Sequence, residues 1–500
     1  MTTPSREIEL KFLLDAAAAE AVLAALPPGE PVVTDLVATY FDTPDHWLRQ
    51  NGFGLRVRRS GKERIQTLKA ALGADGGRDE WEWPVKSDVP DLALLLATPA
   101  PVTADTELIP RFTVRTRRTI RRIRQGDSDI ELALDDAEVT AGDRRDAFVE
   151  LELEFKSGPP SALFDLAREL AAIAPLRLSS VTKAERGFAL VDGVDRGRPR
   201  YAGPRLTADL TAARAFQTLG AACLAHLCAN AESLRDMPGP EGVHQLRVAV
   251  RRLRAGLATF KPLIAVDERE AMKQSLRWLA GELDEARNLD VFIADFWRPA
   301  ARDHHDLPGM AAFGRALLTA QTRAYERAAK AIDSPRFRTL TLETAAWLRT
   351  GPWTADEATA TARGGPAPEF AADALKRRRK KILKAGKRLA DLDRPTRHRV
   401  RIQAKILRYA AEDLGGLFPD HPRRAERFVE SLKALQDALG ALNDLAFGED
   451  LARGVALASD SADAAFAVGR LTGERASDEA ALLKAAEEAF KDFTEARPFW

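Results

Sequence analysis

The chain has 500 residues, of which 45% are hydrophobic and 30% are charged. This length exceeds that of one compact domain, so we expect two or three domains with apolar cores. The 75 Lys and Arg residues nearly balance the 74 Asp and Glu residues, which leaves a net charge of +1. This balance excludes a globally basic or acidic protein, so any function of charge must be local.

Two further observations concern the compartment. Cys223 and Cys228 are too few for a zinc-binding set, and we interpret them as reduced thiols. No apolar run approaches the roughly 18 residues that a membrane-spanning helix needs. No signal-peptide core follows the first six residues. We therefore expect a soluble, cytoplasmic protein.

The first 190 residues place charged side chains at every second position. A period of two is typical of β-strands, whose side chains alternate between the two faces of a sheet. One face is almost purely acidic and basic, and the other is apolar. We therefore predict a closed antiparallel β-barrel with a charged lumen and flanking helices. The stretches that carry this pattern are residues 7–11, 55–58, 80–82, 115–119, 131–135 and 150–154.

Helices and linkers divide the remaining chain. Residues 15–26 and 161–173 read as helices, each stopped by a following proline. Gly and Pro concentrate in residues 192–204, where we place a domain boundary, and from residue 207 the periodicity is helical. A second linker at residues 350–368 divides this helical part. The predicted class is α+β, with a barrel domain at 1–195 and an all-α helical bundle at 207–495 in two halves, 207–349 and 369–495.

The two halves of the helical part carry similar basic stripes. In each, a His is followed by basic residues at +3, +7 and +10, and a Leu-rich helix then leads to an Asn/Asp turn, so we expect a duplication. At these spacings the side chains share one helix face. The stripes are His244, Arg247, Arg251 and Arg254, and His398, Arg401, Lys405 and Arg408.

Concentrated positive charge favours a polyanion ligand for these stripes. Residues 376–408 hold fifteen Lys and Arg but only Asp391 and Asp393 as acids. Like charges repel one another unless an anion is present, although a solvated basic surface is the alternative. Few aromatic residues are available to stack on bases, so nucleic acid is the less favoured ligand. A His near its ordinary pKa would strengthen phosphate binding at mildly acidic pH.

The barrel residues suggest phosphate chemistry. Clustered carboxylates favour a Mg²⁺ or Mn²⁺ site, with Glu7, Glu9, Glu150, Glu152 and Glu154 as candidate ligands. Basic side chains would hold phosphate oxygens, and phosphoanhydride hydrolysis would follow by positioning and electrostatic stabilisation. The alternative is a barrel stabilised only by internal salt bridges. The candidate bases are Lys11, Arg56, Arg58, Lys69, Arg117, Lys183 and Arg186.

Several motifs resemble the CYTH, or triphosphate tunnel metalloenzyme, family. They are the acidic and basic positions 7, 9 and 11 and residues 40–44 (YFDTP), 54–58 (GLRVR), 150–154 (ELELE) and 182–187 (TKAERG). The paired His/Arg helices resemble the CHAD domain. Together they are similar to bacterial CYTH–CHAD inorganic triphosphatases. This resemblance implies triphosphate hydrolysis with a divalent metal in a tunnel, and polyphosphate binding by the helical domain, with a possible location at polyphosphate granules.

The resemblance also implies roles for single residues. Glu7, Glu9, Glu150 and Glu152 would bind metal, with the register of Glu154 left open. The implied catalytic set is Glu7, Glu9, Lys11, Lys69 and Lys183. The implied phosphate contacts include Arg56, Arg58 and Arg117, although Arg115 and Arg118 lie close to Arg117 in sequence. Glu80, Glu82 and Asp135 match tunnel acids. Alternatives are a hydrolase of thiamine triphosphate, an adenylate cyclase, a non-catalytic polyphosphate-binding or granule-targeting protein, and a nucleic-acid-binding protein.

Overall fold

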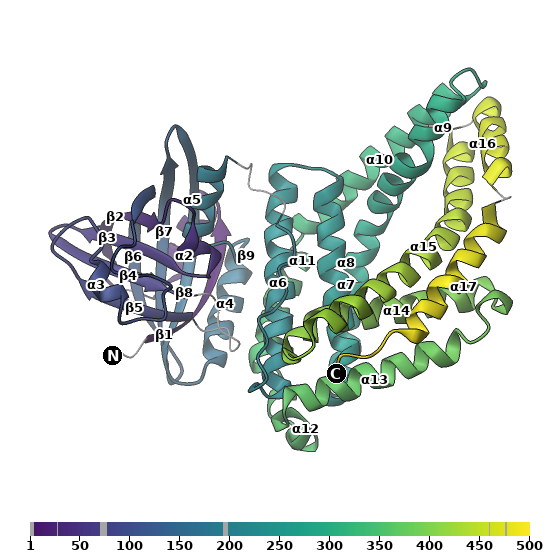
Figure 1. Cartoon of the computed structure of the whole chain (residues 1–500). Helices are drawn as coiled ribbons and strands as arrows, with labels where there is room; N and C mark the ends of the chain where they lie inside the picture. The colour runs from purple at the N-terminus through teal and green to yellow at the C-terminus, as the bar shows by residue number, and fades with distance from the viewer. Residues whose placement is uncertain (1–4, 28, 71–77, 194–198, 460, 476–477) are drawn as a thin grey trace. The chain divides into compact units, whose positions relative to one another are not determined.

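A computed structural model describes residues 5–27, 29–70, 78–193, 199–459, 461–475 and 478–500 (Figure 1). The side chains of residues 5–7, 78, 446 and 475 lie outside the described part. The chain packs into two compact units. The first unit comprises Met1–Arg200, Leu224–Ser233 and Ser334–Pro352, and the second comprises Tyr201–Cys223, Leu234–Asp333 and Trp353–Trp500.

The first unit contains an antiparallel sheet with short helices. Its strands are β1 (Ser5–Leu14), β2 (Val32–Asp42), β3 (Gly54–Ser60), β4 (Glu63–Lys69), β5 (Arg78–Pro84), β6 (Ile109–Gln125), β7 (Ser128–Ala141), β8 (Arg144–Ser157) and β9 (Arg177–Ser179). Its helices are α1 (Ala16–Ala25), α2 (Trp47–Gln50), α3 (Leu92–Leu95), α4 (Ser161–Ile173) and α5 (Lys183–Asp192), and α11 (Pro335–Thr350) also packs in this unit. The two helices expected from the sequence correspond to α1 and α4.

The nine strands form one sheet in the order β5-β4-β3-β2-β6-β7-β8-β1-β9. β1 pairs with β8 and β9, and it additionally pairs with β5 through Ser5↔Glu80 and Glu7↔Arg78. Neighbouring strands along the chain are mostly neighbours in the sheet, as expected for hairpin connections. The long strands β6, β7 and β8 form its central meander.

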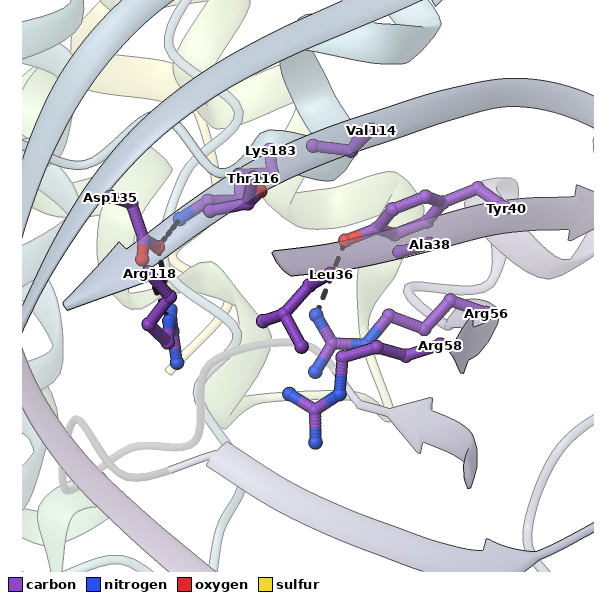
Figure 2. A pocket seen from close by; sticks show the side chains of 10 residues that line it. All are labelled: Leu36, Ala38, Tyr40, Arg56, Arg58, Val114, Thr116, Arg118, Asp135 and Lys183. Atoms are coloured by element: carbon purple, nitrogen blue, oxygen red, sulfur yellow. Dashed lines mark hydrogen bonds and ion pairs between the residues drawn. The ribbon is translucent and has the colours of Figure 1, made fainter. Parts of the chain in front are cut away.

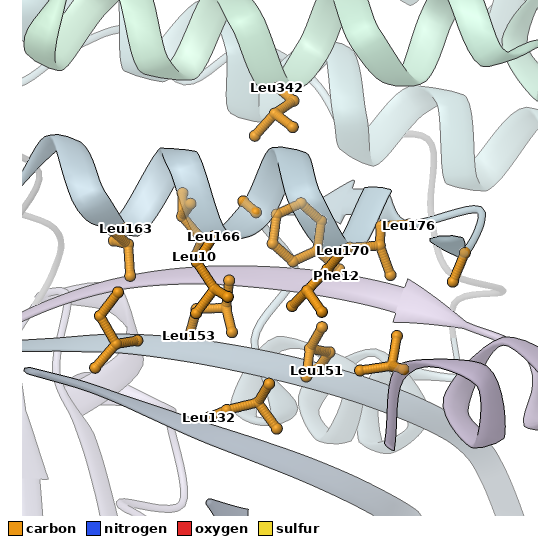
Figure 3. Close-up of a cluster of buried hydrophobic side chains, with 14 of the residues drawn as sticks. Leu10, Phe12, Leu132, Leu151, Leu153, Leu163, Leu166, Leu170, Leu176 and Leu342 are labelled. Carbon is orange, nitrogen blue, oxygen red and sulfur yellow. The ribbon is translucent and has the colours of Figure 1, made fainter. Parts of the chain in front are cut away.

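Helix α4 covers the apolar face of the sheet (Figure 3). Alternate residues of β1 and β8, such as Leu10, Phe12, Leu151 and Leu153, are at most 6% exposed and pack against Leu163 and other leucines of α4. Burial of each such side chain stabilises the fold by roughly 1.5–3 kcal/mol. Because side chains alternate along a strand, this packing directs the intervening charged residues to the other face.

The second unit is helical. Its helices are α6 (Ala212–Asp236), α7 (Pro240–Thr259), α8 (Val266–Phe292), α9 (Arg298–Asp303), α10 (Met310–Asp333), α12 (Ala360–Gly364), α13 (Ala367–Ala385), α14 (Arg394–Leu414), α15 (Pro422–Ala458), α16 (Ala462–Arg475) and α17 (Glu479–Glu495). A ten-residue stretch of α6, Leu224–Ser233, clusters with the first unit. A π-helical segment, Ile293–Trp297, continues α8 into α9, and a short 3-10 helix, η1 (Lys261–Leu263), follows α7.

The architecture confirms the predicted combination of an N-terminal antiparallel sheet with a helical C-terminal region. Residues 350–368, expected as a plain linker, instead form short helical turns and α12. The domain limits at 195 and 207 stay a prediction. Across the helices that the structure describes, none combines the length and apolarity that crossing a membrane requires.

Candidate active site and basic cluster

The register of the sheet gathers the charged side chains of the first unit on one face. Lys11 lies opposite Glu152, and Arg118 lies opposite Asp135, which in turn lies opposite Glu150. Directly opposed residues of antiparallel strands share a face and lie close together. At the other end of the sheet order, Lys69 of β4 lies opposite Glu80 of β5. Charges distant in sequence therefore converge on one surface.

Three buried carboxylates form the centre of this surface. Asp135 and Glu150 are 0% exposed and Glu152 is 9% exposed. Lys11 Nζ lies 2.5 Å from Glu152 Oε1. Arg118 donates to both oxygens of Asp135, at 2.7 and 2.6 Å, and to Glu152 at 2.5 Å. The forked contact with Asp135 fixes the plane of the guanidinium.

Lys183 reaches the same carboxylates from the first turn of α5. Its Nζ lies 2.9 Å from Asp135 Oδ2 and 3.0 Å from Glu152 Oε1, and it also bonds to Glu150. Thr182 caps the helix and forms a capping box with Glu185, which explains why the helix begins at Lys183. The TKAERG motif therefore directs this lysine at the carboxylates.

Arg186, a predicted phosphate ligand, is not part of this group. Its side chain is 0% exposed and bonds to Asp146 at 3.2 Å and to Glu232 at 2.6 Å. Its guanidinium also stacks 4.2 Å from the ring centre of Phe148. These contacts anchor α5, so Arg186 holds the helix that presents Lys183.

Two further predicted bases, Arg56 and Arg58, line a pocket in the same surface (Figure 2). Arg56 and Arg58 of β3 project into the space lined by Tyr40, Arg118 and Lys183. Lys69 Nζ lies 3.3 Å from Glu80. The other polar contacts are those of Arg56 with the Tyr40 hydroxyl (3.4 Å) and with Glu80 (3.9 Å), and that of Arg58 with Glu82 (3.4 Å).

Arg118, rather than the predicted Arg117, contacts the carboxylates of the site. Arg117 is exposed and lies on the opposite face of β6, whereas Arg118 pairs with Asp135 and Glu152. The sequence of β6 carries bases at both odd and even positions, so its periodicity does not identify the inward face. Pairing β6 with the β7 stretch ending in Asp135 would have supplied the missing signal.

Electrostatics keeps the bases of this site charged. Burial alone would lower the pKa of Lys11 and of Lys183, but Glu152 and its neighbouring carboxylates outweigh it and raise both pKa values. Burial alone would likewise raise the pKa of Glu152, but Lys11, Lys183 and Arg118 hold it well below the ordinary value. Burial raises the pKa of Glu150. The lysines therefore suit binding of phosphate oxygens rather than removal of a proton.

The carboxylate group fits a hard divalent cation. Asp135, Glu150 and Glu152 each offer an oxygen, and these atoms all lie within 4.8 Å of one another. Glu150 Oε2 is buried and accepts no hydrogen bond from the described residues. An oxygen set with a vacant lone pair is what Mg²⁺ or Mn²⁺ prefers.

Glu9 and Glu154 lie opposite each other on the same face as Lys11 and Glu152, but the predicted metal ligands belong to the close carboxylate group only in part. Glu150 and Glu152 belong to the carboxylate group, and Asp135, which the sequence placed among the tunnel acids, joins them. Glu9 lies 3.2 Å from Lys11, and Glu154 lies 2.6 Å from Lys156. The side chain of Glu7 lies outside the described residues.

In the second unit, the two predicted stripes lie on α7 and α14, which pack together. Arg251 of α7 donates to the hydroxyl of Tyr409 on α14 at 3.1 Å. Arg401 and Arg251 are close enough to depress the pKa of Lys405 between them. We call this group the central basic cluster: His244, Arg247, Arg251, Arg287, Arg401, Lys405 and Arg408. Arg287 of α8 lies in this cluster although the sequence did not predict it as part of either stripe.

Polar neighbours hold His398 and several members of the central basic cluster. His398, the head of the second stripe, shares a 2.8 Å hydrogen bond with Asn443. Arg408 donates to Gln436 at 2.9 Å and to Glu412 at 3.0 Å. Arg247 pairs with Asp284, and Arg401 lies 4.0 Å from Asp444. The expected Asn/Asp turns are helical positions in α8 and α15. Asn443 and Asp444 of α15 contact these bases, whereas Asp290 of α8 accepts hydrogen bonds from Gln321 and Tyr325.

Burial and mutual repulsion lower the pKa values of several bases in this cluster. Burial, with Arg401 and Arg251, lowers the pKa of Lys405 to about 7. Burial, with Arg251 and Arg287, lowers the pKa of Arg247 to about 10. Burial and Arg287 lower the pKa of His244 to about 4, so this ring is neutral at mildly acidic pH, and the expected His-based pH response fails for His244.

Comparisons with known proteins identify the domains that carry these residues. A model of the CYTH domain matches residues 5–188, and a model of the CHAD domain matches residues 218–453. The matches define the class as a protein of two successive domains. This chain is a CYTH domain followed by a CHAD domain, as the sequence motifs predicted.

Individual relatives cover parts of the chain. An inorganic triphosphatase of Haemophilus influenzae is 33% identical over 157 residues, which are 30% of this chain and 45% of that protein, so the match spans less than half of this relative. The CHAD domain of the plant Ricinus communis is 28% identical, with a TM-score of 0.51, over 58% of this chain and 95% of that structure. The Hippeastrum protein HpAC1, described with a dominant triphosphatase activity, is 21% identical over 37% of this chain and 95% of that structure. Its TM-score of 0.29 is too low to support an activity.

Proposed function

We propose that the first unit hydrolyses inorganic triphosphate to diphosphate and phosphate with Mg²⁺ or Mn²⁺. The observation that carries this proposal is the buried alternation of Asp135, Glu150 and Glu152 with Lys11, Lys183 and Arg118. Burying many ion pairs seldom stabilises a protein more than apolar packing does. A metal ion bound together with a phosphate chain would contact both the carboxylates and the bases, which explains why the site keeps these ion pairs.

A closed barrel is part of this proposal. The additional pairing of β1 with β5 joins strands from opposite regions of the sheet order, which supports closure around the charged face. Inside such a tunnel the charges lie in a low-dielectric space, where they act more strongly on a substrate than in water.

In the proposed reaction, Lys11, Lys183 and Arg118 exchange their carboxylate partners for phosphate oxygens. Arg56 and Arg58 hold the chain farther along the pocket. A metal ion bound by Asp135, Glu150 and Glu152 would supply charge neutralisation and an activated water. Positioning and electrostatic stabilisation then lower the barrier to cleavage of the phosphoanhydride bond.

Neighbouring aspartates on β7 provide a matched test. Asp135 is buried in the carboxylate group, whereas Asp136 is exposed on the opposite face. Asp135→Asn is expected to lower phosphate release from triphosphate by at least about tenfold and to weaken metal binding, whereas Asp136→Asn retains both. Equal rates in the two variants would remove the carboxylate group from the reaction.

A substrate panel distinguishes the proposed activity from its alternatives. Triphosphate, long-chain polyphosphate, thiamine triphosphate and ATP are compared with each metal. Preference for thiamine triphosphate or ATP would indicate an organic substrate, and no turnover of any would leave a binding or granule-targeting protein.

We propose that the second unit binds polyphosphate through the central basic cluster. The cluster supports a polyanion because Lys405 is half-buried among arginines and, over the described residues, has no acid within ion-pair distance. The similar stripes of α7 and α14, each with Pro near the helix start and His four residues into it, also support the proposed duplication. Competition between long-chain polyphosphate and duplex DNA tests the ligand class, and preference for DNA would contradict it.

A further inference from the structure

Cationic side chains continue beyond the central basic cluster along α7 and α8. Asp284 of α8 pairs with Arg247 of α7, which sets the antiparallel register of the two helices. Seven residues farther along α7 and seven back along α8, Arg254 and Arg277 face each other. The next step brings Lys261 of η1 close to Arg269. Bases therefore recur at successive positions of this seam.

Helix α13 adds three bases at the far end of the seam. The ring of Phe260, directly before Lys261, stacks on Phe370 of α13 at 5.1 Å between centroids. This contact brings η1 to α13, and we define an end patch of Lys261, Arg269, Arg377, Arg378 and Lys381.

Positive charge is in excess at the end patch. Lys381 is the main cause of a lowered pKa for Lys261, followed by burial and the nearby arginines Arg269, Arg378 and Arg377. Lys261 and Lys381 are nevertheless exposed. Exposed lysines normally relieve such repulsion by pairing with acids.

Few acids compensate this charge. Glu270 lies 3.4 Å from Arg269, and Asp373 lies 3.8 Å from Arg377. Over the described ranges, no acid lies within ion-pair distance of Lys261, Arg378 or Lys381. The excess requires mobile counterions or an anionic ligand.

We propose that the end patch is a second contact for polyphosphate, which binds the part of a long chain that extends past the central basic cluster. This inference rests on the proposed polyphosphate binding and adds a preference for chain length. His244 and Lys261 are 17 residues apart along α7 and η1. At a helical rise of 1.5 Å per residue, the track is roughly 25 Å long, so only an extended polyanion reaches both ends.

Two lysine pairs provide the test. Lys261→Glu with Lys381→Glu reverses charge in the end patch, and Lys484→Glu with Lys491→Glu makes the same change on exposed positions of α17. Binding of labelled long-chain polyphosphate to the full chain is measured in EDTA, with unlabelled chains of graded length as competitors. The chelator prevents metal-dependent hydrolysis.

The end-patch variant is expected to bind the long chain roughly tenfold more weakly and to lower the salt slope by about 2. Short competitors lose less than about twofold, because they occupy only the central basic cluster. An unchanged long-chain affinity, an equal loss for all lengths, or the same loss in the α17 control would overturn the inference.

The same experiment separates this inference from the proposed function. If the unmodified protein binds no polyphosphate, the proposed function fails and takes the end patch with it. If it binds polyphosphate but the end-patch variant behaves like the α17 control, only the end patch fails. Stronger competition by duplex DNA than by long-chain polyphosphate would assign the track to nucleic acid instead.

Discussion

Lys11, Arg118 and Lys183 meet three carboxylates at distances that leave no room for solvent between the charges. Each base has lost hydration on burial and depends on these partners for compensation. If a metal ion and a phosphate chain were bound together, the carboxylates would pair with the metal ion and the bases would pair with the phosphate oxygens. These ion pairs hold the residues in place, so that they could exchange partners with a metal ion and a phosphate chain.

Neighbouring arginines on β6 test this arrangement at a single residue. Arg118→Lys keeps the charge but loses the forked bond to Asp135, so triphosphate hydrolysis is expected to fall by roughly 10²-fold. Arg117→Lys changes an exposed side chain on the opposite face and is expected to retain activity. Steady-state phosphate release measures both. A larger loss of activity in Arg117→Lys than in Arg118→Lys would mean that Arg117, not Arg118, faces the carboxylates.

Lys405 is expected to give the proposed polyphosphate binding a pH dependence. Because its pKa is lowered to about 7, this lysine is largely neutral above pH 7 in the free protein and charged below it. A polyanion favours the charged form, so affinity should rise as pH falls from 8.5 to 6, by at most about tenfold per pH unit. Calorimetry in buffers of different ionisation enthalpy should show proton uptake on binding above pH 7.

The control is Lys405→Arg, whose guanidinium stays charged over this range. It should bind nearly as tightly at pH 8.5 as at pH 6 and take up little proton. A wild-type profile that persists in this variant would assign the titration to another group. His244 is not that group on present geometry, since burial and Arg287 lower its pKa to about 4.

At the scale of an element, α5 depends on a buried ion pair. Arg186→Leu removes the guanidinium that neutralises Asp146, and breaking a buried pair costs about 3–5 kcal/mol of unfolding free energy. Asp192 of α5 forms an exposed pair with Arg49 of α2. Arg49→Leu breaks this pair and should lower the unfolding free energy by less than about 1 kcal/mol. Urea unfolding compares the two. Similar costs would show that Arg186 does not anchor the helix.

The same elements show what sequence could predict. Proline stops predicted the ends of α1 and α4. Alternation in residues 7–11 of β1 and 150–154 of β8 identified Lys11, Glu150 and Glu152, because only one parity of these stretches is charged. β6 is charged on both parities, so Arg117 and Arg118 could be separated only by pairing with β7. Arg186 shares the motif of Lys183, and motif membership does not reveal which way a helical residue points.

Contacts between helices were harder to predict from the sequence. The stripes of α7 and α14 were predicted from spacing, but Arg287 joins them from α8 through antiparallel packing. The depressed pKa of Lys405 needs burial and three-dimensional neighbours, neither of which a helical pattern encodes. Periodicity thus predicts the face of an element, whereas the opposing face comes from the fold.

At the scale of the whole molecule, the proposed activities depend on different residues in two packing units. Arg401→Glu with Arg408→Glu should weaken long-chain polyphosphate binding by at least about tenfold, because two attractive contacts become repulsive. Asp135→Asn should abolish most triphosphate hydrolysis while polyphosphate binding in EDTA persists. Parallel measurement of phosphate release and labelled polyphosphate binding in both variants, with circular dichroism to check folding, tests this separation. Loss of both activities together in either folded variant would mean that the two units act as one site.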